Sequence, residues 1–182
     1  MISGNLINSI EEQSVITFTG KINVLKKENG QFIGVIYLKE GLIVQAEFQS
    51  TKGKKALFNL IFEDSDFHES FKYVVEPEAI EDKMIAFEYT FELFIKKADS
   101  RYKNYLEVKP LKPPGHLKLS IVPKFISRDG DYSVGPEEFQ VLCDIIDNAE
   151  VENLYKKSAL YDYQITRSLV SLRKKGALVV SA

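Results

Sequence analysis

The sequence has few of the residues that build metal centres or disulfides. Cys143 is the only cysteine, and His68 and His116 are the only histidines. One cysteine excludes an intramolecular disulfide and a cysteine-based metal cluster within one chain, which favours a reducing compartment. Neither histidine has a carboxylate or cysteine at a spacing typical of metal ligands. We therefore expect no metal, no other cofactor and no catalytic residue, and we interpret Cys143 as a small buried hydrophobe.

Long apolar runs and an excess of charge are also missing. No apolar run approaches the roughly 20 residues that a membrane-spanning helix needs. The first residues have neither the basic leader nor the apolar stretch of a signal peptide. Basic residues number 24 and acidic residues 26, so the summed field gives no long-range attraction for nucleic acid or an anionic membrane. These absences predict a cytoplasmic protein without membrane insertion.

Alternating apolar residues predict an antiparallel sheet in the first half of the chain. We expect a strand at 21–27, a hairpin at 32–48 that turns at Gly41, and a strand at 67–75 with His68 on its solvent face. Apolar residues at helical spacing predict a helix at 52–62, which the acidic residues 63–66 would end. A second, longer helix is expected from residue 78 onward. Its apolar stripe comprises Ile80, Met84, Phe87, Phe91 and Phe94.

Prolines after residue 109 divide the chain into two predicted domains. The first covers residues 1–108 and is followed by a linker at 109–131, in which residues 117–121 alternate as an extended segment. The second domain covers 132–182, with helices at 136–147, 151–157 and 161–175 and a strand at 177–180. The predicted fold class is α+β: an antiparallel sheet domain covered by helices, and a small helical domain.

The first 75 residues or so resemble the bacterial PATAN domain, a module often found beside response-regulator receiver domains. The matching motifs are Thr19-Gly20-Lys21-Ile22, Gly34-Val35-Ile36-Tyr37, Gly41-Leu42-Ile43-Val44-Gln45-Ala46 and Gly53-Lys54-Lys55-Ala56-Leu57, followed by the strand at 67–71. Members of that family usually carry a longer helix before the Thr-Gly element than residues 7–18 allow. The second domain resembles a winged helix, in which residues 160–165 form a turn, residues 167–175 a recognition-like helix and residues 177–178 the start of a wing.

The PATAN resemblance implies an adaptor that binds other proteins in bacterial signalling. The expected partners are response-regulator receiver domains or components of motility and surface-filament machinery. Because no receiver is expected within this chain, a phosphorylation signal would arrive in trans. We expect the contact surface to comprise both domains, around the second hairpin arm, the helix at 52–62 and the linker. Its candidate residues are Gln45, Glu47, Lys54 and Tyr89.

A DNA-binding transcriptional regulator is the alternative that the winged-helix resemblance leaves open. Its candidate contacts would be Arg167, Arg173, Lys174 and Lys175. Residues 131–182 contain eight acidic and six basic residues, a net charge of −2, whereas DNA-binding domains carry an excess of Lys and Arg. Asp162 also stands near the start of the recognition-like helix, where phosphate contacts are made. The charge pattern therefore favours protein over nucleic acid as the partner.

Overall fold

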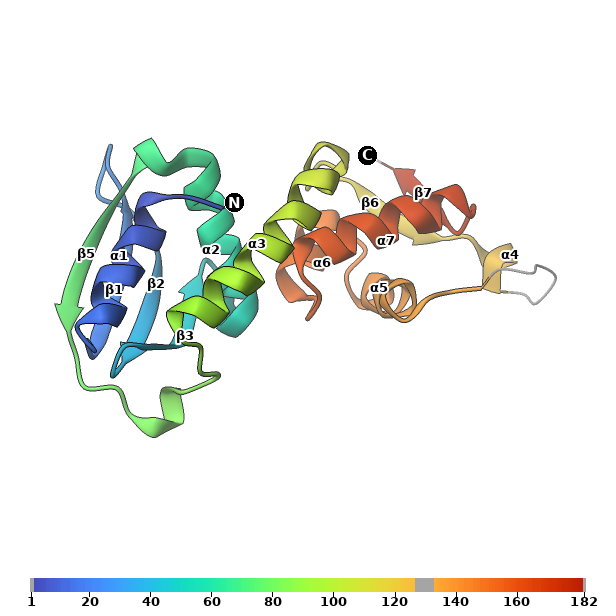
Figure 1. Cartoon of the computed structure of the whole chain (residues 1–182). Helices are drawn as coiled ribbons and strands as arrows, with labels where there is room; N and C mark the ends of the chain where they lie inside the picture. The colour runs from blue at the N-terminus through green and yellow to red at the C-terminus, as the bar shows by residue number, and fades with distance from the viewer. Residues whose placement is uncertain (1, 127–132, 182) are drawn as a thin grey trace. The chain divides into compact units, whose positions relative to one another are not determined.

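A computed structural model describes residues 2–126 and 133–181 (Figure 1). The chain divides into two compact units, Met1–Lys103 and Asn104–Ala182. The division lies within helix α3 (Phe91–Val108), whereas the predicted domain boundary lies at the end of this helix, where the short 3₁₀ helix η3 (Lys109–Leu111) begins. Both units combine helices with antiparallel strands, so the fold is α+β, as predicted.

The first unit contains a five-stranded antiparallel sheet in the order β4-β3-β2-β1-β5. Its strands are β1 (Gly20–Lys26), β2 (Phe32–Lys39), β3 (Leu42–Phe48), β4 (Thr51–Lys52) and β5 (Phe71–Pro77). The hairpin predicted at 32–48 is confirmed as β2 and β3. Glu40 and Gly41 between them have φ of 51° and 79°, the left-handed conformation that a type I′ hairpin turn requires at both central positions.

Helices α1 (Asn5–Val15) and α2 (Gly53–Phe67), together with the first part of α3, contribute the helical part of this core. Leu6 and Ile10 of α1 are fully buried, as are Leu57 and Ile61 of α2. Each pair is spaced by four residues, so both members lie on one face of their helix. The buried strand side chains include Ile22, Val24, Ile36 and Leu38. Along β1 these alternate with half-buried residues, so one face of the sheet packs on the core and the other faces solvent.

The acidic residues 63–66 do not end α2, which corrects the helix predicted at 52–62. Asp64 is only 1% exposed, and its carboxylate accepts a hydrogen bond from the Leu6 N–H (3.1 Å) and another from the Tyr73 hydroxyl. The carboxylate thus faces the core, and the helix continues to Phe67. The 3₁₀ helix η1 (His68–Ser70) follows, so β5 begins at Phe71 and His68 does not lie in a strand.

The prediction of a long helix from residue 78 onward is wrong for residues 78–90, because α3 begins only at Phe91. Between β5 and α3, the only helical turn is the 3₁₀ helix η2 (Asp82–Met84). The N–H groups of Ala86 and Phe87 donate to the Val44 carbonyl (3.1 and 3.2 Å), and Ile43 and Tyr89 exchange two hydrogen bonds (2.9 and 3.0 Å). Residues 86–89 therefore take their hydrogen bonds from the edge of β3, which competes with a helix for the same N–H groups.

The second unit packs three helices and a two-stranded antiparallel sheet around its own core. The helices are α5 (Pro136–Asp147), α6 (Val151–Lys157) and α7 (Asp162–Lys174), and the strands are β6 (Lys118–Ile121) and β7 (Leu178–Ser181). The predicted bounds of α5 and α6 are confirmed. The extended segment predicted at 117–121 contains β6, which pairs with β7, and its Leu119 joins this core.

The predicted linker at 109–131 is therefore partly folded into the second unit. Besides β6 it contains the short helix α4 (Pro123–Ile126), and its residues 127–131 lie outside the described residues. His116 lies exposed in the turn before β6. None of the described helices is both long and apolar enough to cross a membrane.

Candidate protein-interaction surfaces

The hairpin arm β3 carries two of the predicted contact residues, and Gln45 has an internal role. Its side-chain oxygen accepts the N–H groups of Ala46 (3.0 Å) and Gly53 (2.9 Å), and its amide nitrogen donates to the Met84 carbonyl (3.4 Å). Gln45 thereby joins β3 to the start of α2 and to the η2 turn. All of these bonds are made within the unit, and the residue is half-buried.

The other three predicted contact residues surround Gln45. Glu47 forms an ion pair with Lys52 at 2.8 Å. Lys54 lies over the ring of Tyr89, with its Nζ 5.7 Å from the ring centroid, and Lys97 lies at the same distance. Tyr89 is only 7% exposed, and burial raises the pKa of its hydroxyl. The structure thus brings the predicted residues together, but Tyr89 offers a partner little contact area.

The solvent-facing side of the sheet carries a second group of charges near β5. Lys21 on β1 pairs with Glu78 at 2.7 Å and with Glu76 at 3.5 Å, and Asn23 donates to Glu76 at 2.8 Å. The hydrogen bond to Glu78 raises the pKa of the Lys21 ammonium. Exposed ion pairs of this kind contribute little to stability, so this face is a solvated polar surface.

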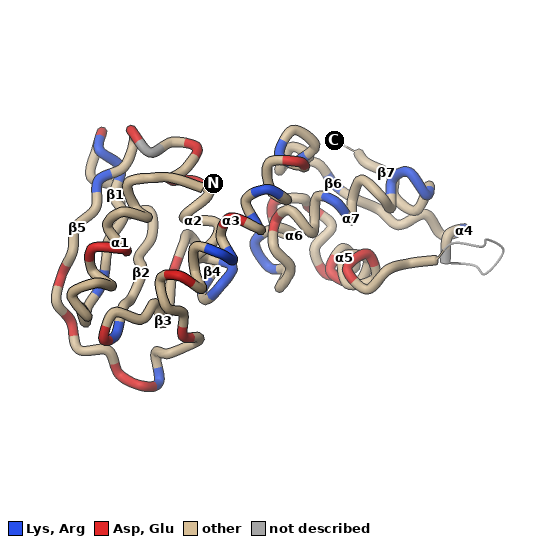
Figure 2. The backbone as a smooth tube through the Cα atoms, in the orientation of Figure 1, with Lys and Arg blue, Asp and Glu red and all other residues tan. Residues whose placement is uncertain are grey.

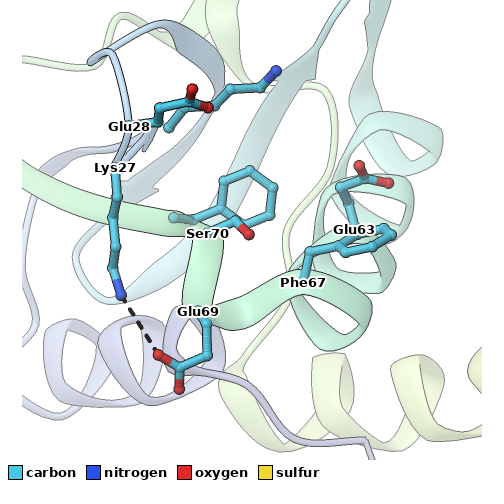
Figure 3. A pocket seen from close by; sticks show the side chains of 8 residues that line it. Lys27, Glu28, Glu63, Phe67, Glu69 and Ser70 are labelled. Carbon is cyan, nitrogen blue, oxygen red and sulfur yellow. Dashed lines mark ion pairs between the residues drawn. The ribbon is translucent and has the colours of Figure 1, made fainter.

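A shallow hollow lies between the end of α2, the start of β5 and the β1–β2 turn (Figure 3). It has a volume of about 620 Å³, and Lys27 and Glu69 point toward one another on its rim, at 3.9 Å (Figure 3). Phe67 is half exposed beside them. The remaining lining residues are Lys26, Glu28, Glu63, Ser70 and Phe71. Charges of both signs are spread over this hollow rather than converging on one point, so it does not define a class of ligand.

Helix α5 presents an apolar face to solvent, which the sequence interpretation missed. Val141 and Ile145 point into the core of the second unit, whereas Phe139 and Ile146 are 63% and 74% exposed. Cys143 lies between them and is only half-buried, which corrects its interpretation as a core residue. Phe139, Cys143 and Ile146 are spaced by four and three residues, so they form one stripe along the helix, here called the α5 ridge. The same spacing was visible in the sequence, but α5 has apolar residues on two faces.

The buried carboxylate of Glu138 fixes α5 on its inner side. Its oxygens accept the Lys175 ammonium (2.7 Å) and the Gly135 N–H (2.7 Å). Burial alone raises the pKa of Glu138, but hydrogen bonds from Lys175, Ser171 and the Gly135 N–H outweigh burial, and the pKa lies below its usual value. Lys175 also donates to the Ser133 carbonyl at 2.8 Å. This candidate DNA contact is therefore part of the internal structure of the second unit.

The remaining candidate DNA contacts lie on α7. Arg167 donates to Asn104 at 3.0 Å and to Glu107 at 3.2 Å, while Arg173 and Lys174 are exposed. Asp162, at the first position of α7, pairs with Lys112 at 2.9 Å. Figure 2 shows basic positions at the end of α7 and acidic positions along α5. Only Arg173 and Lys174 of the four basic candidates are thus without an acidic partner among the described residues.

Comparisons with known proteins do not identify a relative. The chain matched none of the protein-family models, curated proteins or solved structures with which it was compared. Within residues 2–126 and 133–181, no three His, Cys, Asp or Glu side chains form a group that could hold a metal ion. The arguments below therefore rest on the surfaces themselves.

Proposed function

We propose that this chain is a non-enzymatic adaptor that binds another protein in bacterial signalling. The PATAN resemblance of the first unit suggests receiver domains of response regulators as the first partners to test, and motility or surface-filament components as the next. The α5 ridge is the observation that carries the proposal. Large apolar side chains that lie together on the surface of a folded domain are typical of protein-binding sites.

The chemistry of the ridge indicates what it would bind. A helix of the partner could pack its own apolar stripe against Phe139, Cys143 and Ile146. Asp147 is exposed and follows Ile146 by one position, so it lies beside the ridge. A partner helix with Lys or Arg next to its apolar stripe would meet this carboxylate, which favours binding and sets its orientation.

A direct binding measurement tests the adaptor role. Purified receiver domains would be titrated into the full chain, and titrated again into the Ile146→Glu variant. We expect affinity to fall at least tenfold, because a charge would enter an apolar contact. Val179→Glu is the matched control, since Val179 is an exposed apolar residue in the same unit but lies on β7. Equal binding by both variants would remove the ridge as the contact surface.

The surface around β3 and α2 is tested separately. Glu47→Lys and Lys54→Glu reverse two charges there, and neither touches the hydrogen bonds of Gln45. If both variants keep the affinity of the unmodified chain, this surface is not part of the contact. Gln45 itself is unsuitable for the test because its replacement would disturb the start of α2.

DNA binding remains a second candidate because Arg173 and Lys174 are exposed side by side at the end of α7. A salt series in a mobility-shift assay separates the two functions, since phosphate contacts weaken steeply as salt rises. We expect no shift at moderate salt. A specific shift that Arg173→Glu abolishes would instead support the DNA-binding function.

A further inference from the structure

The two edges of the sheet in the first unit differ in how their backbone is covered. At one edge, β3 pairs with β4 and with residues 86–89. At the other, β5 pairs with β1 along its length, and no backbone hydrogen bond among the described residues reaches the outer side of β5. Val74 and Val75 are exposed there. An uncovered strand of this kind can pair with a further strand.

The direction of the free groups on β5 follows from its pairing with β1. The Lys27 N–H donates to the Ser70 carbonyl at 2.8 Å. Lys26 pairs with Phe71, so Lys27 and Ser70 are the next pair in the register of β1 and β5, and they are a hydrogen-bonded pair. In an antiparallel pair, hydrogen-bonding residues alternate along the strand. Lys72, Val74 and Glu76 therefore bond to β1, whereas the N–H and C=O groups of Phe71, Tyr73 and Val75 point away from it. Pro77 has no N–H, so it ends the row of outward donors.

We propose that β5 pairs with β5 of a second copy of this chain, in an antiparallel register centred on Val74. In this register Tyr73 of one copy lies opposite Val75 of the other, and the two residues exchange both of their outward hydrogen bonds. The two Val74 residues face each other as a non-hydrogen-bonded pair, in which side chains come closest. The arrangement has a two-fold axis, which closes the assembly as a dimer.

The charges on β5 select this register and this partner. Centring on Val74 places Lys72 of each copy opposite Glu76 of the other, so opposite charges meet on both sides of the axis. If the centre moves to Tyr73 or to Val75, residues with outward hydrogen-bonding groups still lie opposite one another. Val74 then lies opposite Lys72 or opposite Glu76, and the pairing of Lys72 with Glu76 is lost. A strand that is complementary to itself in one register favours a second copy over an unrelated strand.

Both charged side chains on β5 are accessible to a second copy. Lys72 is exposed and forms no ion pair with another described residue. Glu76 receives Lys21 and Asn23 from its own sheet, and its side chain is still 50% exposed. Its carboxylate can therefore accept Lys72 of the second copy as well. This inference concerns self-association and does not depend on the adaptor role.

Charge reversal tests the register. In sedimentation equilibrium of the full chain, we expect a concentration-dependent dimer. Lys72→Glu or Glu76→Lys alone would weaken it about tenfold or more, because like charges then face each other twice. An equimolar mixture of the two variants should associate again, since the carboxylates of one variant would then face the ammonium groups of the other. Lys157→Glu, which replaces an exposed lysine of α6, is the control for net charge.

A proline variant tests the edge itself. Val75→Pro removes an outward N–H and leaves the hydrogen bonds to β1 in place, and proline is tolerated at such edge positions. We expect a monomer with a circular dichroism spectrum and thermal midpoint close to those of the unmodified chain. The proposal is overturned if the unmodified chain is monomeric at every concentration, if Val75→Pro still dimerises, or if the mixed charge variants fail to associate.

Discussion

The two units expose different kinds of binding surface. In the first unit, the free groups are backbone N–H and C=O groups along β5, which any strand in the right register can satisfy. In the second unit, they are the apolar side chains of the α5 ridge, which require a partner of matching shape. The first surface suits a second copy of the chain and the second suits a different protein. The two can therefore be disabled separately, the first by a proline and the second by a charge.

A buried carboxylate lies behind each surface. Asp64 accepts hydrogen bonds from the Leu6 N–H and the Tyr73 hydroxyl, and Tyr73 belongs to β5. Glu138 lies on α5 itself and receives the Lys175 ammonium. Burial and the Asp64 carboxylate raise the pKa of the Tyr73 hydroxyl, so this donor stays protonated at neutral pH. Because the two carboxylates lie in different units, we expect each to affect its own unit when it is replaced.

Removing the Asp64 carboxylate should have the largest effect on stability. We expect Asp64→Leu to lower the free energy of unfolding by about 2–4 kcal/mol, because two donors in the core lose their acceptor. Asp64→Asn keeps an acceptor oxygen and should cost less. Urea denaturation measures the loss, and amide hydrogen exchange assigns it to residues 2–103. Equal costs for the two variants would mean that the hydrogen bonds are not the cause.

The covered edge of the sheet should be the next most sensitive to proline. Tyr89→Pro removes the N–H that donates to Ile43, and Tyr89→Ala removes the same ring but keeps that N–H. We expect the proline variant to be less stable than the alanine variant by about 1–3 kcal/mol. Thermal or urea unfolding of both variants gives the difference. Val75→Pro at the open edge should show no comparable loss, and a similar loss there would contradict the distinction between the two edges.

Acid should weaken the second unit through Glu138. Its pKa is lower in the folded chain than in the unfolded chain, so its ionised form stabilises the fold at pH values above about 4.3, the usual value for Glu. This contribution is lost as the pH falls through the folded value. Glu138→Gln should therefore flatten the acid limb of the stability profile for residues 133–181, measured by hydrogen exchange between about pH 2.5 and 6. An unchanged acid limb would show that another group is responsible.

The smallest expected effect is that of Ile146→Glu on stability. Ile146 is 74% exposed, and surface substitutions of this kind usually change the free energy of unfolding by about 0.5 kcal/mol or less. Urea denaturation beside the Val179→Glu control measures the change. A loss of several kcal/mol would mean that the ridge belongs to the core of the second unit, and it would then be unavailable to a partner.

The sequence predicted those elements whose residue pattern has one interpretation. Alternating residues along the second arm and Gly41 at the turn indicate the hairpin of β2 and β3, and Pro136 marks the start of α5. The helix predicted over residues 78–90 is wrong because their apolar spacing also fits a helix. In the structure, the N–H groups of residues in this segment bond to the edge of β3, which the local sequence does not indicate. Asp64 was expected to end a helix because a carboxylate is usually exposed. Its donors come from two other elements, Leu6 of α1 and Tyr73 of β5, which the residues around Asp64 do not indicate.

The candidate sites were harder to predict than the fold. Gln45 occupies an alternating strand position that indicates an exposed side chain, but its amide bonds to three segments of the backbone. The α5 ridge was missed because the spacing of Phe139 and Ile146 also fits core residues, a role that Val141 and Ile145 fill instead. The open edge of β5 depends on strand order, which the pattern of a single strand does not contain.

Sedimentation equilibrium of Val75→Pro and Ile146→Glu, measured in parallel with the unmodified chain, is the most direct test of the two separate surfaces. The account predicts that Val75→Pro is a monomer, while Ile146→Glu forms a dimer as tightly as the unmodified chain. If Ile146→Glu is the monomer and Val75→Pro the dimer, the chain associates through the α5 ridge, and the assignment of β5 to self-association is contradicted.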